Sequence, residues 1–192
     1  MRRIIRLTCL ALALGLAAPA AFAAPAAYVL EPEKSTVGFE TDFGPDRITG
    51  SMPVLKADLT LDFASPANSN VDVTLNAAGA QASFPFATQA MRGPKVLDAG
   101  ANPTIHFVST RVRPSGDGAE VDGKITIRGV TKPVTLDARI YQQQGSAKGD
   151  LTHMTLRLTG SVKRSDFGAM GWSDMVGDEV RLDILARVQK AD

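Results

Sequence analysis

The sequence predicts an all-β protein, an eight-stranded antiparallel up-and-down barrel with a short helix in its third connection. Three observations favour this fold class. Apolar and polar residues alternate along most of the 192-residue chain, and a period of two places them on opposite faces of a β-strand. Each alternating segment has a single apolar face, so the strands need a shared interior. The strands are long, and a closed barrel removes the edges that a sandwich would leave exposed.

The alternation divides the chain into eight predicted strands. They lie at residues 27–43, 47–64, 69–77, 103–113, 118–129, 132–144, 150–164 and 178–190. The apolar phase changes within the second strand, because Ile48 and Met52 occupy even positions whereas apolar residues from Ala57 onward occupy odd ones. A one-residue slip turns every later side chain to the opposite face, so we expect a β-bulge near Pro53.

The clearest hairpin is formed by residues 123–136, GKITIRGVTKPVTL. Alternation on both sides of a tight connection at Gly129 and Val130 predicts two antiparallel strands with one dry and one solvated face. Gly129 can adopt the positive φ that such a turn often requires. Pro133 lacks an N–H and is tolerated at the first residue of a strand. Three glycines at inward positions are expected to leave space inside the barrel: Gly50, Gly123 and Gly160.

The predicted helix lies in the third connection. Phe86, Ala87, Ala90 and Met91 share one face at helical spacing, and Gly93-Pro94 ends the segment. This apolar face belongs to one end of the predicted barrel.

The connections at the two ends of the barrel differ in length and polarity. Successive connections of a meander lie at alternate ends, and those at 65–69, 114–118 and 145–149 are short and polar, which predicts a closed, solvated end. At the other end, residues 77–102 and 164–177 are long and apolar for loops. An entrance for an apolar ligand needs such a rim, although aromatic side chains that plug a solid barrel would explain the same composition.

The N-terminus is predicted to be a secretory signal peptide, residues 1–23. Three arginines precede an apolar run at residues 7–16, which is too short to span a bilayer, and Ala21-Phe22-Ala23 is a cleavage site. Cleavage leaves residues 24–192 as one domain and changes the net charge from +1 to −2 by removing three basic residues. This charge argues against a nucleic-acid partner. The only cysteine, Cys9, is also removed, which leaves no disulfide and no thiol chemistry.

The sequence contains no recognisable catalytic or metal-binding constellation. His106 and His153 have no second ligand at metal spacing. Ser165 has no base placed in sequence to activate it. We therefore expect a protein that is not an enzyme and has no metal site.

Several segments in chain order resemble the YceI-like family, which comprises periplasmic, lipocalin-like barrels that hold polyisoprenoid lipids. Besides the hairpin, they are YVLEPEKSTVGFE (28–40), NPTIHFVST (102–110), KRSDFG (163–168) and VGDEVRLDI (176–184). The chain departs from the family pattern at Lys34, where a histidine is usual, and at Val96-Leu97, where the family has an aromatic pair. The second departure borders the rim and concerns the chain length and head group of the ligand.

The resemblance implies a periplasmic protein that holds the isoprenoid tail of a quinone or related amphiphile in an apolar tunnel, for transport or storage. The side chains expected to line the tunnel and rim are Phe39, Leu61, Phe63, Leu75, Phe84, Phe86, Met91, Ile105, Phe107, Ile125, Ile127, Leu136, Leu156, Leu158, Phe167, Met170, Trp172, Leu182 and Ile184. Arg92, Lys95 and Arg164 are candidates for contact with the head group, and ion pairs with Asp98 and Asp166 are the alternative role for such basic residues.

No cofactor is expected beyond the bound lipid. The expected partners are a long-chain isoprenoid lipid and, transiently, a membrane; the oligomeric state stays open, with a homodimer as one outcome. Two other functions stay open as well: a barrel enzyme that acts on a lipid or isoprenoid head group, and a ligand-free stress or interaction protein with a solid interior.

Overall fold

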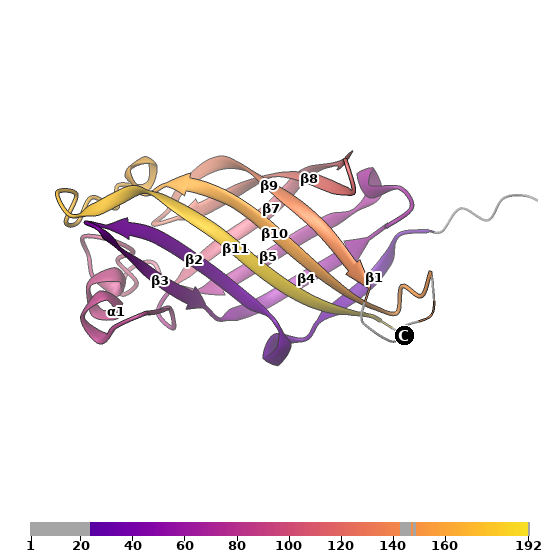
Figure 1. Ribbon diagram of the computed structural model, residues 1–192, viewed down its shortest axis with the longest axis horizontal. Helices are drawn as coiled ribbons and strands as arrows, with labels where there is room; N and C mark the ends of the chain where they lie inside the picture. Colours follow the sequence, from indigo (N-terminus) through magenta and orange to yellow (C-terminus); the bar gives the residue numbers. More distant parts are fainter. Residues whose placement is uncertain (1–23, 143–146, 148, 192) are drawn as a thin grey trace, which may run out of the picture.

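The structure, a computed structural model, describes residues 24–142, 147 and 149–191 and forms a closed antiparallel β-barrel (Figure 1). The predicted signal peptide and part of the connection at 145–149 lie outside these residues. The strands are β1 (Ala26–Leu30), β2 (Thr36–Phe43), β3 (Asp46–Met52), β4 (Val54–Leu61), β5 (Asn70–Asn76), β6 (Gln81–Ala82), β7 (Thr104–Ser115), β8 (Gly118–Ile127), β9 (Val130–Gln142), β10 (His153–Lys163) and β11 (Val176–Lys190). The helix α1 spans Pro85–Arg92, and the 3₁₀ turns are η1 (Pro32–Lys34), η2 (Pro66–Asn68) and η3 (Arg164–Phe167).

The barrel is eight-stranded, which confirms the predicted fold class, because β1 and β2 are two parts of one strand, β3 and β4 are two parts of another, and β6 is a short addition at an edge. The sheet order is β1-β4-β5-β7-β8-β9-β10-β11-β2-β3-β6, and pairing of β1 with β11 closes it. Two predicted strands are each interrupted: η1 separates β1 from β2, and Pro53 separates β3 from β4. Pro32 begins η1, and Pro53 lies between β3 and β4. Proline has no N–H to donate to a ladder, so each proline interrupts its strand, while the pairings on either side keep the barrel closed. The short β6 pairs with the edge of β3 and leads into α1.

The expected bulge near Pro53 is confirmed, and the structure has two further register shifts that we did not predict, one of them in the β2–β11 ladder between Val176 and Val180. The β4–β5 register shifts between Val54 and Lys56. The β7–β8 register shifts between Ser109 and Arg111, which moves the buried residue from an odd to an even position, Val112. The inward Ser109 hydroxyl accepts a hydrogen bond from the Val71 N–H at 2.8 Å, so this buried polar group is satisfied.

The β8–β9 hairpin turns one residue earlier than expected, at Arg128 and Gly129, with φ of 52° and 73°. Positive φ at both central residues gives a turn whose twist matches the flanking strands. Pro133 is the fourth residue of β9, not the first, and lies opposite Lys124 of β8. On its other side, the pairing of β9 with β10 covers Asp137–Gln142, so this ladder does not require an N–H from Pro133.

The inward glycines do not leave empty space, contrary to expectation. A Cβ on Gly50 would lie 2.3 Å from the Phe39 ring, and one on Gly123 would lie 2.4 Å from the Phe107 ring. Each aromatic ring therefore covers the backbone of a glycine on the neighbouring strand. The absence of a side chain is needed for this close approach.

The two ends of the barrel differ as predicted (Figure 1). One end carries α1, the β2–β3 turn and the loop between β10 and β11, whereas the other carries η2 and the tight β7–β8 turn. The buried side chains form two clusters, one centred on Ile105, Ile125 and Leu136 and the other on Tyr28 and Met154. No helix in the described ranges is long and apolar enough to cross a membrane.

Candidate functional site

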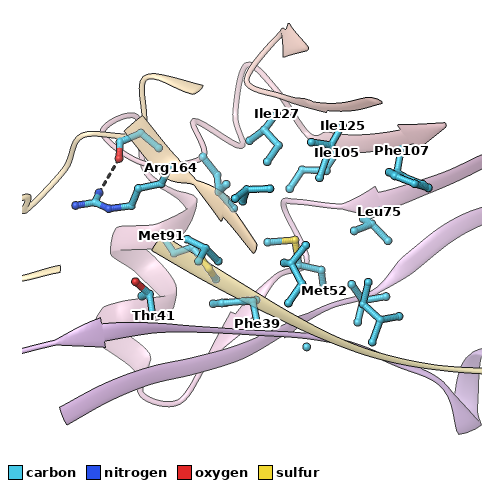
Figure 2. A pocket seen from close by; sticks show the side chains of 18 of the residues that line it. Phe39, Thr41, Met52, Leu75, Met91, Ile105, Phe107, Ile125, Ile127 and Arg164 are labelled. Atoms are coloured by element: carbon cyan, nitrogen blue, oxygen red, sulfur yellow. Dashed lines mark hydrogen bonds between the residues drawn. The ribbon is translucent and has the colours of Figure 1, made fainter. Parts of the chain in front are cut away.

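The barrel encloses a cavity of about 320 Å³ (Figure 2). Residues of β1 to β5, of β7 to β11, of α1 and of both long rim loops line it. Nearly all of them are aliphatic or aromatic; among the lining residues that the structure describes, only Thr41, Arg164 and the indole of Trp172 carry a polar group. The inward face created by the alternating pattern is therefore the wall of a hollow, apolar site.

Most of the residues predicted for the tunnel and rim border this cavity. Those that line it are Phe39, Leu61, Leu75, Phe84, Phe86, Met91, Ile105, Phe107, Ile125, Ile127, Leu136, Leu156, Leu158, Phe167, Trp172, Leu182 and Ile184. Many of them, such as Leu158 and Ile184, point inward and still keep accessible surface, because the space in front of them is not filled.

Phe63 and Met170 lie elsewhere. Phe63 follows the end of β4, and its ring packs edge-on against Tyr28, with ring centroids 5.5 Å apart. It belongs to the packed closed end of the barrel and not to the cavity wall. Met170 lies in the loop between η3 and β11 and is 54% exposed, so it points away from the interior.

Aromatic side chains from different loops surround the mouth of the cavity. Phe86 at the start of α1 and Trp172 of the second rim loop meet nearly edge to face, with ring centroids 6.5 Å apart. Phe43 and Phe84 form a second pair, with centroids 6.2 Å apart. Trp172 has a φ of 53°, a conformation that is uncommon for a bulky residue and marks a constrained position.

Arg164 organises the second rim loop and lines the cavity at the same time (Figure 2). The residue is 8% exposed. Its guanidinium donates four hydrogen bonds of 2.6–2.9 Å to backbone carbonyls of the loop and of β11, namely those of Ala169, Gly171, Val176 and Gly177. Burial lowers the pKa of Arg164, and the nearby Asp178 opposes this shift. Four committed N–H groups leave little capacity for a ligand head group.

The other two head-group candidates are also engaged by the protein. Arg92 Nε donates to the Ala80 carbonyl at 2.7 Å. Lys95 Nζ lies 5.8 Å from the centre of the Trp172 ring, a cation–π distance. Among the described residues, these side chains contact carbonyls and a ring face, and no ion pair joins them to Asp98 or Asp166.

Sequence reasoning missed two residues that hold the rim together. Arg128, in the β8–β9 turn, donates to the carbonyls of Pro94 at 2.9 Å and Val96 at 2.6 Å. The Thr41 hydroxyl lies 2.8 Å from the Glu179 carbonyl oxygen, on the neighbouring strand. Thr41 is an inward polar residue in an apolar pattern, which is a visible signal, whereas nothing in the sequence indicates the contacts of Arg128.

The site contains no arrangement suited to acid–base or metal chemistry within the part of the chain that is described. No carboxylate, histidine or cysteine lines the cavity there. No group of three or more potential metal ligands occurs among those residues. His106 instead pairs on the outer face with Asp72, with 2.7 Å between Nε2 and Oδ1.

A closed β-barrel with an apolar interior cavity defines a class of proteins that bind hydrophobic ligands. The YceI-like domain matches residues 28–188, and the chain therefore belongs to the YceI-like family. Family members are generally binding proteins, and the cavity is consistent with a hydrophobic ligand.

The chain is similar to curated bacterial proteins and to solved structures. It is 32% identical over 119 residues to a UPF0312 protein of Serratia proteamaculans, covering 62% of each chain. It is 33% identical over 109 residues to one of Pseudomonas paraeruginosa, covering 57% of this chain and 56% of that one. The matches thus span about three fifths of these relatives.

Two solved structures share the fold. BcnA of Burkholderia cenocepacia gives a TM-score of 0.74 at 22% identity and covers 83% of this chain and 99% of that one. A YceI protein of Campylobacter jejuni gives 0.61 at 25% identity and covers 71% and 81%. At 22% identity the likeness to BcnA concerns the fold alone.

Proposed function

We propose that the protein binds the isoprenoid tail of a quinone or a related long-chain amphiphile, for transport or storage in the periplasm. The observation that carries this proposal is the cavity, which is almost wholly apolar and reaches from an aromatic mouth into the barrel. Its volume of about 320 Å³ lies at the lower end of the range of ligand pockets. It is about twice that of an apolar cavity that stays dry and binds benzene.

Transfer of the tail into the cavity differs in energy between water and a membrane. Each buried methylene contributes about 0.8 kcal/mol relative to water. The tail is already dry in a bilayer, so transfer into the cavity is close to balanced there, and contacts at the mouth decide its direction. Because Thr41 and Arg164 already bind backbone carbonyls, the polar head of the ligand is proposed to stay at the mouth.

The mouth also supports the proposed transient contact with a membrane. Three apolar side chains of α1 and the second rim loop are exposed: Phe86 by 66%, Met170 by 54% and Met175 by 47%. Exposed apolar groups beside a binding site are typical of surfaces that contact lipid or protein. The predicted signal peptide supports export to the periplasm.

Native mass spectrometry of the protein purified from its host, before and after extraction with organic solvent, tests the proposal. We expect an adduct whose mass identifies a polyprenyl lipid, which disappears on extraction and returns when a polyprenyl quinone is added. Protein that carries no adduct and does not take up the quinone would contradict the proposal. Conversion of the added quinone into a product would favour the alternative of a barrel enzyme.

A further inference from the structure

We propose that a packed layer at the closed end of the barrel sets the maximum length of the apolar tail that the cavity accepts. We call this the floor layer and define it as Tyr28, Met154 and Val188, which belong to one packed cluster. All three are 5% exposed or less, and the cavity lining includes none of them. The proposal rests on the proposed function, since it assigns a specificity-determining role within the same site.

On β10 and β11 the strand registers place the floor layer next to the cavity wall. Leu156 of β10 and Ala186 of β11 are paired with each other, and both line the cavity. The next inward pair on the same two strands is Met154 and Val188, which are 2% and 0% exposed. On these two strands the boundary between hollow and filled interior therefore falls within one step from one inward pair to the next.

The floor layer belongs to one packed cluster of buried side chains and is anchored by a hydrogen bond. Tyr28 of β1 packs edge-on against Phe63, and its hydroxyl donates to the Leu151 carbonyl at 2.9 Å. A tail that enters from the mouth meets tightly packed side chains here, and close-packed interiors do not yield to extra methylenes without strain.

This geometry predicts a break in the relation between chain length and affinity. Binding from water should strengthen about fourfold per methylene while the tail still fills the cavity. A longer tail leaves its surplus outside the mouth, so affinity stops rising. Substitutions at the floor should move the break. Met154→Ala should open space that joins the cavity and lengthens it by about 7 Å, the distance between successive inward residues of a strand. Ala186→Phe should fill the end of the cavity that lies next to the floor layer.

The test measures the affinity of delipidated protein for a series of 1-alkanols of increasing length, with free and bound alcohol separated by ultrafiltration. In the wild type we expect a steep rise followed by a plateau. Met154→Ala should move the onset of the plateau to longer alcohols and Ala186→Phe to shorter ones. Thr155→Ala is the matched control, because Thr155 is the neighbour of Met154 on the same strand but lies outside the cavity lining, so the onset should stay unchanged.

The outcomes separate this inference from the proposed function. Circular dichroism first establishes that each variant is folded, and Ala186→Phe keeps the test decisive if Met154→Ala does not fold. An onset that stays in place in the folded Met154→Ala and Ala186→Phe variants, or moves equally in Thr155→Ala, overturns the inference. Wild-type affinity that rises without a plateau also overturns it while the proposed function stands. Failure of the wild type to bind any alcohol overturns the proposed function itself.

Discussion

Replacement of Arg164 by methionine should loosen the mouth of the cavity and destabilise the protein. The guanidinium donates four hydrogen bonds to carbonyls of the loop that carries Trp172. Hydrogen bonds from charged donors contribute about 1.5–3 kcal/mol each, and burial of the charge offsets several kcal/mol of that sum. We therefore expect the free energy of unfolding to fall by about 2–4 kcal/mol, or about 4–16 °C in melting temperature.

Two signals measure this effect independently. Urea denaturation followed by circular dichroism reports the barrel, while the fluorescence of Trp172, the only tryptophan, reports the loop. The Trp172 emission of Arg164→Met should shift to the red before the barrel unfolds, because the carbonyls left without donors will recruit water. Arg113→Met is the control, since Arg113 is an exposed arginine paired with Glu120 and Asp122, and it should change stability by less than about 1 kcal/mol. Equal stability and unchanged emission in the two variants would refute the organising role of Arg164.

Three further predictions concern the wall and the rim. Ile127→Asp places an unpaired carboxylate against the cavity and should lower the free energy of unfolding by more than about 4 kcal/mol. Thr126→Asp, on the outer face, should change stability little. Similar thermal melts of the two variants would disprove the inward phase of β8. Gly123→Ala should lower stability by about 1–3 kcal/mol, because its Cβ would lie 2.4 Å from the Phe107 ring. Gly100→Ala is the control, because a Cβ there would have no atom within 4 Å. Equal urea midpoints of the two variants would rule out the clash. Hydrogen bonds from the Ser165 hydroxyl and N–H lower the pKa of Asp178. Its contribution to stability is therefore present above the unfolded-state pKa of about 4 and is lost as pH falls through the lower pKa of the folded state. Asp178→Asn should flatten the pH dependence of the urea midpoint below about pH 4, and an unchanged profile would count against this linkage.

Local patterns in the sequence predicted the barrel because they report which way each side chain points. Alternation placed Leu158 and Ile184 on the inward face, and the phase change located the break at Pro53. The same reasoning overlooked the bulge after Ser109, although Val112 stands out of phase there. Alternation also assigned Phe63 to the tunnel, because it specifies the face of a strand and not the depth along the barrel axis.

The sequence by itself determined the family, the inward apolar set and the difference between the two barrel ends, since each depends on residue order over short distances. Only the tertiary structure decided whether the interior is hollow, where it ends and what the basic rim residues do. A cavity is the volume left between side chains from many strands, and the Phe39 and Phe107 rings filled the space that Gly50 and Gly123 had suggested. Arg164 and Arg128 find their carbonyl partners through loop conformations, so their charges in the sequence did not disclose their structural roles.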